Sequence, residues 1–211
     1  MTKIIAVIAA NGRTGQAFVH MALSAGHTVR AGYNGVNNLP DHKNLVAVKC
    51  DATYEMDVRE LLNGADVVVS LIGHIKGSPA NVQTDAMKVI VKVMNELRIV
   101  RLISLTGTGV RFPGDRPGLL DRFLNISIKL IDPRRISDGI NHARYIESSM
   151  LEWTIIRVLK LTNGKSSGRV KFSLTGPAEL FTPRERVAKG ILQIITEDTY
   201  VRKAPIVQGE E

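Results

Sequence analysis

Unbroken apolar stretches alternate along the chain with stretches in which apolar residues recur every three or four positions. The first apolar stretch begins at Ile4 and carries no charge, which is typical of a strand buried on both faces of a parallel sheet. A turn with Gly12 and Gly15 follows, and then a helical pattern with Phe18 and Met21 on one face. Further strands are predicted over residues 28–33, 45–50, 65–73, 99–105 and 153–158.

Helical patterns separate these strands. Helices are predicted over residues 57–62, 80–98, 119–131 and 136–150. A last helix is expected to begin with Thr182 as its cap, followed by a proline and, three residues after the cap, a glutamate. A short strand over residues 170–174 and a final edge strand over residues 204–207 complete the pattern. Strands that alternate with helices in this way predict an α/β fold with a doubly wound parallel sheet.

The length of the chain suits one domain. Its 211 residues are predicted to form a single dinucleotide-binding domain over 1–211, with substrate-side elements from about 111–150 and 159–182. No apolar run reaches the roughly 18 residues of a membrane span, and no cleavable signal fits the first residues, so a cytoplasmic location is expected. The single cysteine, Cys50, ends an apolar run and is interpreted as a buried small hydrophobe.

The net charge of +8 suits an anionic ligand, such as a phosphate-rich cofactor or a nucleic acid. The basic residues are scattered and aromatic residues make up only 5% of the chain, which argues against a nucleic-acid partner. The histidines have no partners at metal-ligand spacing, so no metal is predicted. The chain also has no Gly-x-Ser-x-Gly elbow of the α/β-hydrolase kind.

The glycine turn is the main candidate for chemistry. A strand, a glycine turn and a helix in sequence place backbone N–H groups and the positive end of a helix dipole against an anion. The pattern predicts a pyrophosphate site, hence a dinucleotide. Ala9 stands where the first of three glycines is usual. Its methyl group is tolerated if the residue keeps ordinary backbone angles.

Several short motifs occur in a familiar order: residues 11–15, Asp51, residues 70–73, and residues 152–157 with their Trp-Thr-Ile-Ile-Arg run. Over about residues 3–207, the chain resembles the atypical short-chain dehydrogenase/reductase group of NmrA-like NAD(P)-binding proteins, including flavin and biliverdin-IXβ reductase-like members. The resemblance implies a Rossmann fold and a nicotinamide dinucleotide cofactor.

The resemblance also implies which residues contact the cofactor. The turn at residues 12–15 would hold the pyrophosphate, Asp51 would face the adenine, and Thr106 would lie near the nicotinamide. Ala9, Asn34 and residues 158–159 depart from the family pattern. The implied cofactor-binding set is Ala9, Asn11, Gly12, Arg13, Thr14, Gly15, Asn34, Asp51, Leu71, Ile72, Gly73, Thr106, Gly107, Val158 and Leu159.

The choice between NADP and NAD depends on two positions. An NAD site usually has an acidic residue near the end of the second strand, and none stands there. Arg13 is the best available cation for the 2′-phosphate of NADP, and its alternative is an exposed arginine at a helix start. The sequence thus favours NADP over NAD.

The proton relay common in the superfamily, a tyrosine with a lysine four residues later, is absent because none of the four tyrosines has that lysine. Two catalytic candidates follow from the resemblance. His142 would donate a proton or hydrogen-bond the substrate, or else be a solvent-facing helix histidine. Thr106 would orient nicotinamide or substrate, or else cap the next segment.

Two hypotheses about function remain. The first is an NAD(P)H-dependent oxidoreductase that transfers a hydride to a flat, conjugated small molecule such as a flavin or quinone. The alternative is a non-catalytic NAD(P)-sensing regulatory protein. The apolar helix over residues 119–131 has three interpretations: a cover over a substrate pocket, packing on the core, or a homodimer contact.

Overall fold

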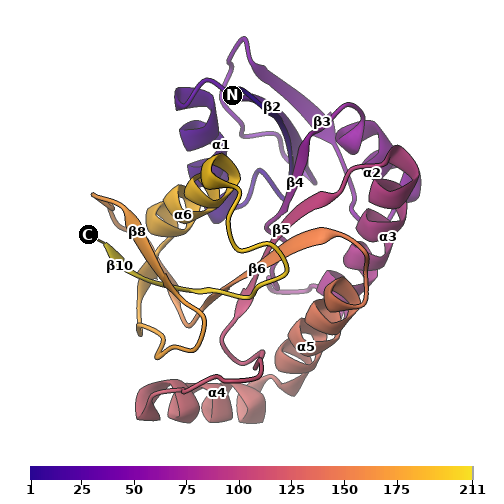
Figure 1. Cartoon of the computed structure of the whole chain (residues 1–211). Coiled ribbons are helices and arrows are strands. Elements are labelled where there is room, and N and C mark those ends of the chain that lie inside the picture. The colour runs from indigo at the N-terminus through magenta and orange to yellow at the C-terminus, as the bar shows by residue number, and fades with distance from the viewer. Residues whose placement is uncertain (211) are drawn as a thin grey trace.

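An eight-stranded sheet runs through the centre of the computed structural model, which describes residues 1–210 (Figure 1). The strands lie in the order β3-β2-β1-β4-β5-β6-β10-β8, and all neighbouring pairs are parallel except β10 and β8. The order reverses at β1 and β4, which confirms the predicted doubly wound fold. The sheet contains β1 (Ile4–Ile8), β2 (Thr28–Tyr33), β3 (Leu45–Lys49), β4 (Val67–Ser70), β5 (Arg101–Gly107), β6 (Glu152–Val158), β8 (Val170–Ser173) and β10 (Ile206–Glu210).

Helices cover both faces of the sheet, as Figure 1 shows. One face carries α1 (Arg13–Ser24) and α6 (Arg184–Glu197), and the other carries α2 (Glu55–Leu62), α3 (Val82–Leu97) and α5 (Pro133–Glu147). The sixth helix, α4 (Leu119–Ile131), lies beyond α5 at one end of the molecule.

The unbroken apolar strands are explained by this two-sided cover. Val67 and Val69 of β4 pack into the apolar cluster formed with α1 and α6, whereas Val68 packs into the cluster on the opposite face. Successive side chains of a strand point to opposite faces, so a strand between two helix layers is apolar at every position. Cys50 is buried as predicted, and burial raises the pKa of its thiol to about 12.

Two predicted details at the C-terminal end are wrong. Thr182 does not cap α6, because Thr182–Pro183 forms a short strand, β9, paired with β7 (Leu161–Thr162). The Thr182 N–H donates to Lys160 O, which holds the backbone extended up to the first helical residue. The last strand is not at the edge either: β10 lies between β6 and β8, and β8 forms the edge.

Candidate functional site

The predicted cofactor residues meet at one edge of the sheet. Parallel register places Ile8 of β1 opposite Ser70 of β4, and Ser70 opposite Ser104 of β5. Gly107 pairs with Val158 in the same way. The segments that leave these strands therefore emerge side by side at the carboxyl edge, where α/β sheets bind their ligands.

The glycine turn presents backbone N–H groups to this edge. Gly12 is the N-cap of α1, has an ordinary φ of −72°, and supplies no side chain to cap the helix. The first turn of α1 also contains no acidic residue. An additional Cβ on Gly15 would lie 2.3 Å from Ala9 O, so only glycine allows the helix to pack this closely on the turn. The turn fits a pyrophosphate, whose charge would complete the helix N-terminus.

The other helix N-termini already contain acidic groups. Asp138 accepts from the backbone N–H groups of Gln83 and Thr84 at the start of α3. Asp132 accepts from Arg135 N at the start of α5, and α2, α4 and α6 each have an acidic residue in the first turn. Among the helices of residues 1–210, α1 alone combines an uncapped N-terminus with a first turn free of carboxylates.

Ala9 departs from what the sequence suggests. Its φ is +59°, in the left-handed region, so the condition of ordinary backbone angles, under which its methyl group would be tolerated, is not met. The turn bends sharply here because Gly12 N donates back to Ala9 O at 3.1 Å. For a residue with a Cβ, this conformation costs about 1–2 kcal/mol of conformational free energy, whereas glycine adopts it without that cost.

The turn is tied to the loop that follows β2. Asn11 Nδ2 donates to Asn34 O at 2.9 Å and to Val36 O at 3.3 Å, and Gln16 Nε2 donates to Asn11 O. Asp51 has a local partner: its Oδ1 accepts from both the N–H and the hydroxyl of Thr53. The carboxylate predicted to face the adenine is therefore held in a turn at the end of β3.

Arg13 lies beside a second arginine that sequence reasoning missed. Arg184, the first residue of α6, hydrogen-bonds Asn163 Oδ1 at 2.8 Å. Burial lowers the pKa of Arg184, and the neighbouring charge of Arg13 lowers it further. Both arginines line one groove with Asn163 and Gly164. Two guanidinium groups in one groove attract an anion. Because 171 positions separate the two arginines in the sequence, no local pattern indicates that they meet.

The two catalytic candidates lie on the same side of β5: Thr106 belongs to the strand, and His142 reaches it from α5. Thr106 is buried under α5. The helix lies so close that a Cβ added to Gly139 would be 3.3 Å from Thr106 Oγ1. Ser104, two residues earlier on the same face, lies 3.0 Å from His142 Nε2. His142 is only 2% exposed, so the solvent-facing alternative is wrong.

The buried position of His142 fixes its charge state. Burial lowers the pKa of His142 to about 4, and the opposing effect of nearby Asp138 is smaller. The imidazole is therefore neutral at pH 7. Its Nδ1 has no hydrogen-bond partner within residues 1–210.

Asp138 organises the neighbouring loop and was not predicted. Besides its contacts with α3, it lies 2.8 Å from His74 Nε2. Gln83, whose backbone Asp138 holds, donates its side-chain Nε2 to Ile72 O. Residues 71–73, expected to line the adenosine, are thus held from both sides of the loop by contacts that depend on a carboxylate from α5. The sequence shows only a polar residue inside a helical pattern, which gives no hint of this role.

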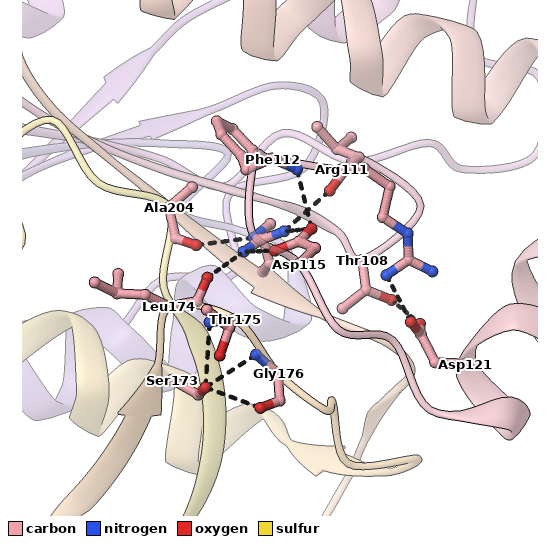
Figure 2. A network of polar contacts seen from close by, with 12 residues as sticks. Thr108, Arg111, Phe112, Asp115, Asp121, Ser173, Leu174, Thr175, Gly176 and Ala204 are labelled. Carbon is pink, nitrogen blue, oxygen red and sulfur yellow. Dashed lines mark hydrogen bonds and ion pairs between the residues drawn. The ribbon is translucent and has the colours of Figure 1, made fainter.

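A buried ion pair anchors the loop that follows β5. Arg157 Nη1 and Nη2 lie 2.5 and 2.9 Å from the two oxygens of Asp115, and both side chains are almost fully buried. The guanidinium also donates to the carbonyls of Ala204 and Leu174 and stacks over Phe112. Figure 2 shows Asp115 among these groups. The pair joins the loop after β5 to the end of β6 and the segment after β8.

A second cluster holds α4 against the same loop. Asp121, which is buried, pairs with Arg111 at 2.6 Å and accepts from Thr108 Oγ1 at 2.6 Å. Asn125 Nδ2 donates to the same carboxylate. The Thr108–Asp121–Arg111 contacts are visible in Figure 2. The polar face of α4 therefore packs toward the carboxyl edge, one residue beyond Gly107.

Solved structures share this fold, and one of them is a complex with NADP. The chain is similar to the oxidoreductase ylbE from Lactococcus lactis, with a TM-score of 0.82 and 17% identity over 99% of this chain and 91% of that chain. A short-chain dehydrogenase/reductase from Veillonella parvula, in complex with NADP, has a TM-score of 0.81 and 19% identity over 100% and 95%. A proposed NADH-flavin reductase from Streptococcus pneumoniae has a TM-score of 0.79 and 16% identity over 99% and 100%.

The sequence comparisons identify the family. No curated protein matches the chain. A family model described as NAD(P)H-binding matches residues 9–198, which include the glycine turn, all the predicted cofactor positions and the whole of α6. This match confirms the resemblance drawn from the motifs. The chain therefore belongs to the NAD(P)H-binding family.

Proposed function

We propose that the protein is an NAD(P)H-dependent oxidoreductase of the atypical short-chain type, which reduces a flat, conjugated acceptor such as a flavin or a quinone. The observation that carries this proposal is the uncapped, carboxylate-free N-terminus of α1 at the carboxyl edge. Thr106 and Gly107 of β5 lie at the same edge, paired with Arg157 and Val158 of β6. A dinucleotide with its pyrophosphate on α1 would extend its nicotinamide toward this pair of strand ends.

In this proposal some residues bind the cofactor and others orient the reacting groups. When bound, the cofactor supplies the hydride. The N–H groups at the start of α1 hold the pyrophosphate, and Thr106 orients the nicotinamide or the acceptor through its hydroxyl. His142, neutral at pH 7, acts through Ser104 as a hydrogen-bond partner rather than as a cationic acid. Flavins and quinones suit such a site, because they need little acid catalysis to accept a hydride.

NADP is the proposed cofactor, with NAD as the alternative. The segment after β2 offers Asn34 in place of the acid that an NAD ribose prefers. Arg13 supplies a cation, and its position beside Arg184 adds a second one to the same groove. The variant Arg13→Ala separates two roles: loss of NADP binding alone assigns Arg13 to the 2′-phosphate, and equal loss of NADP and NAD assigns it to the pyrophosphate.

Anaerobic mixing with NADPH and a panel of flavins and quinones tests the proposed reaction. We expect oxidation of the nucleotide, followed at 340 nm, with at least one acceptor. Thr106→Val, which keeps the shape and removes the hydroxyl, should lower the turnover more than tenfold while nucleotide binding remains. Failure of every acceptor to oxidise NADPH above background would contradict the proposal.

A sensor that binds the nucleotide without turnover is the second candidate. Two features favour it. Ala9 has a left-handed backbone where a glycine is usual, and the tyrosine–lysine relay common in the superfamily is missing. Titration calorimetry distinguishes the two candidates. Micromolar binding with equal affinity for oxidised and reduced nucleotide, together with no turnover, would support the sensor.

A further inference from the structure

The outer face of α4 is apolar and exposed. Leu119, Phe123, Ile126 and Leu130 recur at spacings of four, three and four, and each is at least 60% exposed. They form one stripe along the helix, because these spacings return to the same side of an α-helix. Of the 13 residues of α4, only Asp121 is buried. The helix thus turns its polar side to the protein and its apolar side to the outside.

This orientation is held by the protein itself. Asp121 and Asn125 contact Thr108, and Arg111 pairs with Asp121. The apolar stripe lies on the opposite side of the helix from these contacts. Of the three interpretations of this helix, packing of its apolar face on the core is therefore excluded. Exposed apolar patches of this kind mark interaction surfaces.

The charges around the stripe are positive. Arg122 and Lys129, which are exposed, lie seven residues apart along one border of the stripe. Arg116 precedes α4, and residues 134 and 135, both exposed arginines, follow it. The acidic residues of the segment already have partners: Asp115 pairs with Arg157 and Asp121 with Arg111, while Asp132, exposed at the end of α4, accepts from the backbone N–H of Arg135 in α5. A partner that covers the stripe therefore meets an apolar centre with a basic border.

A second copy of the chain does not fit this surface. An antiparallel pair of α4 helices would bring the two basic borders together, with no free carboxylate on the helix to offset the repulsion. The contact would also be small: a helix of 13 residues is about 20 Å long and about 10 Å wide. Such a footprint, roughly 200 Å² when flat, is well below the roughly 800 Å² per partner of a stable interface.

We propose that α4 docks the protein on the surface of an anionic lipid bilayer. The stripe of Leu, Phe and Ile side chains enters the boundary between headgroups and acyl chains, and the basic border meets anionic headgroups. The helix lies in the plane of the interface, and within residues 1–210 no helix is long and apolar enough to cross a bilayer. This inference is independent of the proposed reaction, although docking would turn the carboxyl edge beside Thr108 toward the lipid.

Flotation of the full chain with vesicles tests the inference. Vesicles of phosphatidylcholine alone are compared with vesicles in which about one third of the lipid is anionic phosphatidylglycerol. We expect the protein to float with anionic vesicles, and at least tenfold less partitioning into neutral ones. Binding should weaken between 0.05 and 0.5 M salt, on the order of several-fold or more, because charge attraction is screened.

Two variants separate the apolar and basic contributions. We expect each of two double variants to lower partitioning into anionic vesicles at least tenfold. One is Phe123→Gln with Leu130→Gln in the stripe, and the other is Arg122→Glu with Lys129→Glu on its basic border. Met56→Gln, at an 83% exposed position on α2, is the matched control and should bind as the native protein does. Circular dichroism and the melting temperature report whether each variant folds; if the double glutamine variant does not, Phe123→Gln alone carries the test.

The contrary outcomes are clear. Failure of the native protein to float with anionic vesicles at low salt would overturn the inference. Equal flotation of the α4 variants and the native protein would do the same. A native dimer in light scattering that becomes monomeric in the glutamine variant would assign the stripe to a second copy instead.

Discussion

At the scale of single residues, Ala9 shows what the sequence can hide. The substitution of alanine for the first glycine is visible in the sequence, but the left-handed backbone is not. Because Ala9 has a φ of +59°, we predict that Ala9→Gly relieves strain. The free energy of unfolding should rise by about 1 kcal/mol, less the entropy that glycine adds to the unfolded chain. Urea unfolding measures the change, and destabilisation by more than about 1 kcal/mol would contradict it.

His142 predicts a dependence of stability on pH. The pKa of His142 is about 4 in the folded protein and 6.5 in the unfolded chain. Between these pH values the unfolded chain binds a proton that the native protein does not. The native protein is therefore favoured at high pH and loses stability as the pH falls below 6.5. At pH 5 the loss from this group is roughly 2 kcal/mol.

The variant His142→Gln isolates this contribution. Urea unfolding at pH 7.5 and pH 5 should show a smaller pH-dependent loss in the variant than in the native protein. His27, whose pKa is also lowered by burial, contributes equally to both and cancels in the comparison. An identical loss in the two proteins would show that His142 is not neutral in the folded state.

At the scale of elements, the N-terminus of α3 depends on a carboxylate from another helix. Asp138 is fully buried, and its oxygens accept from two backbone N–H groups of α3. Asp138→Ala leaves these donors without a partner in a buried position. We predict a loss of about 3 kcal/mol in the free energy of unfolding, measured by urea titration.

The same helix provides the control for this prediction. Asp85 is also acidic and in the first turn of α3, but its side chain is half exposed and pairs with the exposed Lys88. Asp85→Ala should change the free energy of unfolding by no more than about 0.5 kcal/mol. Similar losses in both variants would mean that the helix dipole, rather than the buried hydrogen bonds, carries the effect.

At the scale of the whole molecule, the Arg157–Asp115 pair joins three segments that are far apart in the sequence. Removing one partner leaves the other charge buried and unpaired, which costs about 3–5 kcal/mol. We predict this loss for Arg157→Met and for Asp115→Leu alone, and a much smaller combined loss than the sum for the double variant. Arg59→Ala, which breaks the exposed pairs of Arg59 with Glu55 and Glu96, is the control and should cost less than about 1 kcal/mol. Additive losses in the double variant would contradict the coupling.

The sequence predicts the fold well because the fold depends on local periodicity. The apolar runs of β1, β4 and β6 and the stripe of α3 each carry their own signal. Contacts between distant segments carry no local signal. Asp138 of α5 with the start of α3, Arg184 with Arg13, and Arg157 with Asp115 all meet across long separations in the sequence. For this reason the edge of the sheet that holds the site could be predicted, while the side chains that support it could not. The position of β10 inside the sheet was missed because edge and interior strands of this length look alike.

The central claim is that the glycine turn of α1 binds the dinucleotide, and Gly12→Asp tests it most directly. Gly12 is an N-cap with φ of −72°, a position that aspartate also adopts, so the fold should lose about 1 kcal/mol at most. At about 4 Å and an effective dielectric near 20, the carboxylate would repel a phosphate charge by roughly 4 kcal/mol before screening. Gly12→Asn is the matched control, with the same shape and no charge.

The measurement is the melting temperature with and without NADP and NAD. At about one hundred times the dissociation constant, the native protein should gain roughly 5–10 °C, since binding contributes about 2.7 kcal/mol. Gly12→Asn should retain part of this gain, and Gly12→Asp should melt near the native nucleotide-free temperature with no gain from either nucleotide. A Gly12→Asp variant that gains as much as the native protein would show that this turn is not the dinucleotide site.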